Sequence, residues 1–176
     1  MVTFDASDVI PLDDFPHHWR LIDPRWDSLS DVVLARLQPL SPSCAQRILE
    51  RAQRLRNSGI PFVNTAGYYV EHATPVSGEP SAVVDWLSNL PVAASAMVFV
   101  SWNDGAALAT DWKTFTGIWD RLWYPLDVVN IFDDSLDWGV LFGPEEFAVY
   151  IKPGSVNDFP GERDFRSGYG LMQVPG

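Results

Sequence analysis

The sequence of 176 residues combines 47% hydrophobic with 20% charged residues, and its formal net charge at pH 7 is −11. A chain of this length and apolar content buries a substantial core, so the composition excludes disorder throughout and predicts one domain. The acidic balance excludes nucleic acid as the expected partner, because phosphate binding needs a cationic surface, and it favours a basic partner.

The first forty residues carry only short local signals for regular structure. Ser30 is a suitable N-cap for a brief helix that ends at Leu37. Leu29 and Leu34 occupy the two positions of a hydrophobic staple around that cap. This segment therefore predicts one short helix in an otherwise irregular stretch.

A longer amphipathic helix is predicted after Pro39. Ser43 and Gln46 form a capping box, and apolar residues then recur at helical spacing, namely Cys44, Ile48, Leu49, Ala52 and Leu55. Asn57-Ser58-Gly59 closes the helix. A second stripe of the same helix consists of Arg47, Arg51 and Arg54, and Glu50 is placed to pair with Arg54. We interpret this stripe as a solvated face, and the alternative is an anion-binding site.

The middle of the chain predicts a strand, a short helix and a second strand. Residues 67–73 alternate in the manner of a half-buried strand. After a loop over residues 74–80, Pro80 fits the first turn of a helix that Pro91 stops and that buries Val83, Val84, Leu87 and Leu90. The uninterrupted apolar run from Ala96 to Val100 predicts a central strand.

The strongest helical pattern comes next. Thr110 is a good N-cap, and Asp111 complements the helix dipole. Pro125 ends the helix. Its broad apolar face consists of Trp112, Phe115, Ile118, Trp119 and Leu122. Three apolar runs joined by turns of hairpin length then predict an antiparallel meander of strands, at Val128–Phe132, Trp138–Phe142 and Phe147–Ile151.

These elements predict a single α+β domain over residues 1–152, in which helices pack on one face of a mainly antiparallel sheet. Residues 153–176 are rich in glycine, proline and charge, and we expect them to form an extended or mobile arm. Cys44 is the only cysteine, which fits a reducing cytoplasm. Met1 to Asp5 begin with acid rather than base, and no apolar run approaches membrane-spanning length, so we expect a cytoplasmic protein without a membrane partner.

Residues with reactive side chains form no catalytic or metal-binding pattern. His17 and His18 follow an acidic pair, but adjacent side chains in extended backbone point apart and the spacing is not that of a metal site. Cys44 lies in a first helical turn, which favours a reactive thiolate, yet it belongs to the apolar stripe. His72 has no nucleophile or carboxylate at informative spacing. We therefore expect no catalytic residue, metal ion or cofactor.

Acidic residues are concentrated between Asp104 and Glu146, where nine acids face two bases. The two turns of the predicted meander contain Asp133, Asp134, Asp137, Glu145 and Glu146. Solvated turn residues are one interpretation, and acid–base chemistry or a cation site is another, although the run lacks the periodicity of a calcium loop. We favour a protein-binding surface, because carboxylates steer a basic partner and the neighbouring Trp123 and Tyr124 supply aromatic anchors.

The aromatic pattern of the second half resembles that of a known class of proteins. The run Trp112-x-x-Phe-x-x-x-Trp119-Asp120-x-x-Trp-Tyr124-Pro125, followed by Ile131-Phe132 and Trp138-Gly-Val-Leu-Phe142, resembles a pattern in small acidic bacterial immunity proteins of polymorphic toxin systems. Trp19-Arg20, Asp23-Pro24 and Pro39-Leu40-Ser41 are similar to segments of such small proteins.

This resemblance extends from Trp19 to Ile151 and implies a compact mixed domain that binds and neutralises a cognate toxin. It carries no catalytic assignment, because the shared residues are aromatic side chains of the scaffold. We expect the toxin to have a basic substrate-binding cleft, as a nuclease has, in which carboxylates mimic phosphates. The alternatives are a small enzyme with an unrecognised site and a structural or adaptor domain.

Overall fold

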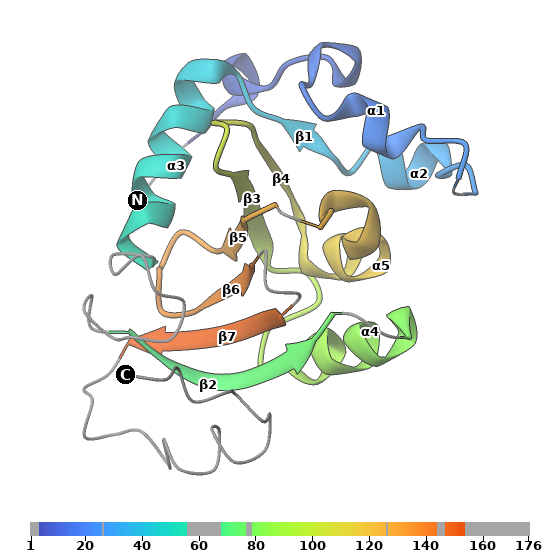
Figure 1. Ribbon diagram of the computed structural model, residues 1–176. Helices are drawn as coiled ribbons and strands as arrows, with labels where there is room; N and C mark the ends of the chain where they lie inside the picture. Colours follow the sequence, from blue (N-terminus) through green and yellow to red (C-terminus); the bar gives the residue numbers. More distant parts are fainter. Residues whose placement is uncertain are drawn as a thin grey trace, which may run out of the picture.

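The computed structural model describes residues 4–25, 27–55, 68–76, 79–125, 127–143 and 147–153. These residues build a seven-stranded sheet in the order β1-β4-β3-β5-β6-β7-β2, with antiparallel pairing between all neighbours (Figure 1). The strands are β1 (Gln38–Pro39), β2 (Tyr68–Pro75), β3 (Met97–Trp102), β4 (Ala107–Asp111), β5 (Val129–Phe132), β6 (Gly139–Phe142) and β7 (Phe147–Pro153). The predicted meander is confirmed as β5, β6 and β7.

Helices cover both faces of this sheet, and Figure 1 shows α3 on one side with α4 and α5 on the other. The helices are α1 (His18–Leu21), α2 (Asp31–Leu34), α3 (Pro42–Leu55), α4 (Pro80–Asn89) and α5 (Trp112–Leu122), and short 3₁₀ turns occupy Ala6–Asp8 and Leu12–Asp14. The α+β class, the single domain and the antiparallel sheet are confirmed. The prediction that helices would pack on one face only is wrong.

The side chains of β3 explain why both faces are covered. Val98, Val100 and Trp102 join the core beneath α4 and α5, whereas Phe99 joins the core beneath α3. Successive residues of a strand point to opposite faces, so an uninterrupted apolar strand is buried on both sides. The run that predicted a central strand therefore also requires two layers of helix.

Aromatic rings attach α5 to the meander. The ring of Trp119 stacks on that of Phe142, with centroids 5.6 Å apart and an interplanar angle of 18°. Phe115 meets the same Phe142 ring edge-on at 6.3 Å, and Trp112 meets Trp138 at 5.5 Å. These contacts bury the apolar face that the spacing of α5 predicted.

Helix α1 and strand β1 were not predicted in the first forty residues, and two helix caps and strand β4 also differ from the sequence prediction. The Oγ of Ser41, rather than that of Ser43, accepts the N–H of Cys44 at 3.4 Å, because α3 begins at Pro42. Asp111 caps α5 by accepting the N–H of Thr114 at 2.8 Å. Thr110 is instead buried in β4, a strand that was not predicted because the run Ala-Leu-Ala-Thr-Asp lacks β-branched alternation.

Parts of the sequence prediction lie outside the described residues. These are the helix end at Asn57-Ser58-Gly59 and the C-terminal arm beyond Pro153. Within the described segments, the helices are too short or too polar to cross a lipid bilayer.

Replacing Trp119 by alanine tests the core between α5 and the meander. The buried ring stacked on Phe142 disappears, so we expect the free energy of unfolding to fall by about 3–5 kcal/mol, measured by chemical denaturation. Val32→Ala, on the exposed side of α2, is the control and should change it by less than about 0.5 kcal/mol. A loss below about 1 kcal/mol for Trp119→Ala would contradict this assignment.

Candidate protein-binding surface

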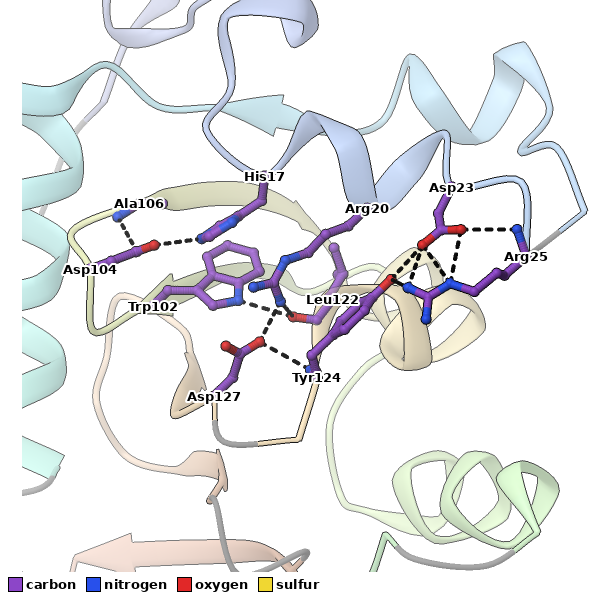
Figure 2. A network of polar contacts seen from close by, with 10 residues as sticks. All are labelled: His17, Arg20, Asp23, Arg25, Trp102, Asp104, Ala106, Leu122, Tyr124 and Asp127. Carbon is purple, nitrogen blue, oxygen red and sulfur yellow. Dashed lines mark hydrogen bonds and ion pairs between the residues drawn. The ribbon is translucent and has the colours of Figure 1, made fainter.

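A buried arginine fastens the N-terminal segment to the end of α5. Arg20 lies on α1 and is 5% exposed, and its Nη1 donates to the carboxylate of Asp127 and, at 3.5 Å, to the carbonyl of Leu122 (Figure 2). The same carbonyl accepts the indole N–H of Trp102 at 3.0 Å. The guanidinium also lies 4.8 Å from the ring centroid of Tyr124. Because a buried charge must be neutralised, this cluster fixes where α1 docks.

A second polar group adjoins this cluster on its solvent side (Figure 2). The carboxylate of Asp23 accepts the Arg25 Nε–H at 2.9 Å and the Tyr124 hydroxyl at 3.1 Å. Hydrogen bonds from the side chain and backbone of Arg25 hold the pKa of Asp23 well below its usual range. The backbone N–H of Tyr124 donates to Asp127 at 3.0 Å. Tyr124, an expected partner anchor, is thus half-buried in an internal network.

Trp123, the other expected anchor, also supports the fold. Its ring is half-buried and lies 6.5 Å from that of Trp119 and 6.3 Å from that of Phe142. Its indole nitrogen is buried and has no hydrogen-bond partner among the described residues. The residue therefore exposes only part of its ring to a partner.

The acidic loop between β5 and β6 is held by its own carboxylates. Asp133 accepts the N–H of Ser135 at 2.9 Å with one oxygen and the indole N–H of Trp138 at 2.8 Å with the other. The carboxylate of Asp134 lies 3.3 Å from Nη2 of Arg51 on α3. Both aspartates are half-buried, which differs from the expected exposure, whereas Asp137 is exposed. The burial of Asp133 reflects local turn chemistry, since its carboxylate accepts the backbone N–H two residues on and so closes an Asx turn, whereas Asp134 is covered by its pairing with Arg51 of α3.

The structure separates this loop from the aromatic anchors. Val129 pairs with Phe142 at one end of the β5–β6 ladder, and Phe132 pairs with Gly139 at the other. Trp123 contacts Phe142, whereas Asp133 to Asp137 follow Phe132. The expected combination of loop charge with the corner at Trp123 and Tyr124 is therefore not formed. Glu145 and Glu146, the remaining expected residues, lie outside the described residues.

Two histidines each lie beside a carboxylate. His17 is 7% exposed between the rings of Phe15 and Trp102, at 5.7 and 4.9 Å, and its Nε2 lies 3.0 Å from Asp104. Burial, with a smaller effect of Arg20, lowers the pKa of His17, so the ring is neutral at pH 7. His18 Nε2 lies 3.4 Å from Asp13.

Neither pair lies at the surface hollow described below, and neither belongs to a metal-binding group of the described residues. A surface hollow is lined by Phe4, Val9, Ile10, Pro11 and Gln38, and neither histidine belongs to its lining. Within the described segments, histidine, cysteine and acidic side chains do not gather in threes at metal-binding distance. Cys44 is buried in the core beneath α3, and burial raises the pKa of its thiol. The side chain of His72 is not among those described.

Arginines on α3 and on the segments around it form ion pairs with neighbouring carboxylates. Arg36 lies 3.4 Å from Asp111, and Arg47 lies 3.1 Å from Asp8. The stripe that Arg47 and Arg51 form on α3 is therefore paired, in agreement with a structural rather than an anion-binding role. The side chain of Arg54, the third member, is not among those described.

The described surface keeps an excess of negative charge after this pairing. Its exposed cationic side chains are Arg25, Arg36, Arg47 and Lys113. Its exposed carboxylates are Asp5, Asp13, Asp14, Asp27, Asp31, Glu50, Glu79, Asp85, Asp104 and Asp137.

Among the residues that the structure describes, four large apolar side chains are also exposed. They are Trp19, Ile22, Val32 and Met97. The sequence around Trp19 and Ile22 does not mark them as binding residues, because α1, with four residues, is too short to show a periodic pattern. An exposed tryptophan beside a second apolar side chain is a feature of binding surfaces.

Comparison of the chain with protein-family models, with curated proteins and with solved structures gave no match. The candidate surface is therefore defined by its geometry and charge. Its features are an acidic exterior, an exposed apolar pair on α1 and arginines held in ion pairs.

Asp133 and Asp137 provide a matched pair of substitutions in one loop. Asp133→Ala removes the acceptor of the Trp138 indole and of the Ser135 N–H, so we expect the free energy of unfolding to fall by about 1–3 kcal/mol. Asp137→Ala removes an exposed side chain and should change it by less than about 0.5 kcal/mol. Urea denaturation of both variants measures the difference. Equal effects would mean that the Asp133 contacts do not hold the loop.

His17 should make stability depend on pH. As the pH falls below about 6.5, the unfolded chain binds a proton at His17 while the buried ring stays neutral, so stability is lost until the lowered folded pKa is reached. We expect His17→Gln to lose less stability than the parent protein between pH 7.5 and pH 5.5, as measured by urea denaturation. Asp120, whose pKa burial raises, is present in both proteins and cancels. If the two proteins lose the same stability over this pH range, burial does not keep the His17 ring from binding a proton.

Proposed function

We propose that this protein is an immunity protein, which binds a basic protein toxin stoichiometrically and neutralises it in the cytoplasm. The observation that carries the proposal is the imbalance of exposed charge. Arg20, Arg36, Arg47 and Arg51 are engaged with carboxylates of the same chain, while the exposed carboxylates of the described residues face solvent. The resemblance of the aromatic pattern to immunity proteins supports the same class.

The charge imbalance favours a partner with a cationic cleft. Opposite surface potentials steer two proteins together and raise the association rate, which matters for an inhibitor that must act before its target does damage. A cleft that binds phosphates also accepts carboxylates at similar positions. The toxin class that fits best is therefore one acting on nucleic acid.

Within the acidic loop, the structure supports different tasks for the three aspartates. Asp137 is exposed and available to a partner, so it is the residue of this loop that we assign to binding. Asp133 and Asp134 shape the loop through Trp138 and Arg51. Their contribution to binding is then indirect, through the position of Asp137.

A small enzyme is the second candidate, and the pairing of His17 with Asp104 is the observation that favours it. A histidine oriented by a carboxylate is the usual arrangement of a general base. His17, however, lies between two aromatic rings and is nearly inaccessible, so a substrate would have to displace Phe15 or Trp102 to reach it. We therefore place this candidate second.

Co-expression with the toxin encoded by a neighbouring reading frame tests the proposal. The protein should restore growth and form a 1:1 complex whose association slows as salt rises, because salt screens the attraction between opposite charges. Asp137→Lys should slow association, while Asp85→Lys, which changes another exposed aspartate on α4, serves as the control for charge alone.

Two results would contradict the proposal. The first is full toxicity when the protein is present in excess. The second is protection by the protein at far below one molecule per toxin, which would indicate turnover and favour the enzyme.

A further inference from the structure

Two exposed apolar side chains belong to α1 and to the residue that ends it. Trp19, in α1, is 48% exposed, and Ile22, the C-cap residue of α1, is 61% exposed. The two residues are three positions apart, a spacing that brings side chains to the same side of a helical turn. Exposure of a tryptophan to this extent leaves much of its ring in water, which is unfavourable unless a partner covers it.

The ring of Trp19 is held in a fixed orientation. It meets the ring of Tyr124 at 5.3 Å with an interplanar angle of 65°, and the guanidinium of Arg20 lies 5.1 Å from its centroid. Arg20 is itself fixed by Asp127 in the buried cluster shown in Figure 2. A side chain that is ordered before binding loses little conformational entropy when a partner covers it. Trp19 therefore has the composition and the rigidity of an interface anchor.

The charges around this apolar surface indicate what covers it. Exposed carboxylates flank α1 on both sides in sequence, namely Asp13 and Asp14 before it and Asp27 and Asp31 after it. The cations of this region have local partners: Arg25 pairs with Asp23, Arg20 pairs with Asp127, and the guanidinium of Arg121 donates to the backbone carbonyl of Asp27. The chain on either side of the apolar pair is therefore rich in exposed carboxylates, of which Asp13 lies 3.4 Å from His18 on α1 itself.

An arginine side chain matches both properties at once. Its planar guanidinium stacks on an indole ring and binds carboxylates, and its aliphatic stem packs on apolar surface. We propose that Trp19 and Ile22 are the anchor of the partner interface, and that the partner inserts an arginine from a basic surface over the open part of the Trp19 ring. This assignment rests on the proposed function and adds to it a place and a chemistry of contact.

A second copy of the chain is a poorer occupant. Each copy carries a net charge of −11, so two copies repel each other when their acidic segments around α1 face one another. A basic protein gains attraction from the same carboxylates. Sedimentation at increasing protein concentration separates these two cases.

Titration of the full chain with a nona-arginine peptide tests the anchor directly. In ¹⁵N spectra, the indole signal that Trp19→Ala removes should shift saturably, and this substitution should weaken binding about fivefold or more. A nona-lysine peptide of the same charge should bind less tightly, since an ammonium does not stack on the ring. Met97→Ala, an exposed apolar side chain of β3, is the matched control and should bind like the parent protein.

Ile22→Asp provides a second variant in case Trp19→Ala disturbs the packing of Tyr124. The change lies at a largely exposed position, so denaturation should show an intact fold while peptide binding weakens. Binding of nona-arginine that neither substitution alters would overturn the inference. A concentration-dependent dimer that Trp19→Ala abolishes would also overturn it, by identifying a second copy as the occupant.

The toxin co-expression assay separates failure of the anchor from failure of the proposed function. If the parent protein protects cells and Trp19→Ala combined with Ile22→Asp protects equally, the anchor is wrong and the proposed function stands. If the parent protein gives no protection while nona-arginine still binds in a Trp19-dependent manner, the proposed function is wrong and the arginine-binding surface stands.

Discussion

The buried guanidinium of Arg20 is the constraint on which the N-terminal half of the structure depends. Its charge is compensated by Asp127 and by the carbonyl of Leu122, both supplied by the chain at and just after the end of α5. In this position the guanidinium also lies 4.8 Å from the centroid of the Tyr124 ring. The ion pair therefore sets the position of α1, and with it the orientation of every side chain that α1 presents to solvent.

The fold class was predictable because its main elements carry hydrophobic patterns within continuous stretches of sequence. The apolar periodicity of α5 and the three apolar runs after it identified the helix and the meander, and the run before Val100 identified the central strand. The prediction missed β4 and placed the helices on one face. The errors have different causes: the sequence of β4 lacks β-branched alternation, whereas the second covered face depends on α3, a helix that is far from the central strands in sequence.

The site was less predictable, because its contacts join distant residues. Asp133 stands beside Ser135, and this turn chemistry is visible in the sequence. Arg20 and Asp127, in contrast, are 107 residues apart, and no spacing rule connects them. Trp19 becomes an oriented, half-exposed ring only once Tyr124 lies against it, so its role follows from tertiary structure alone.

The same ion pair gives the chain a temporal order during synthesis. A ribosome releases residues from the N-terminus onward, and α1 emerges about a hundred residues before its counter-ion, so α1 has no docking site until translation has passed Asp127. His17 likewise has no contact with Asp104 until the turn between β3 and β4 has been synthesised. The exposed side chains of α1 are thus oriented only after more than a hundred further residues have been made, and a nascent chain that stops before Asp127 lacks the counter-ion that holds them.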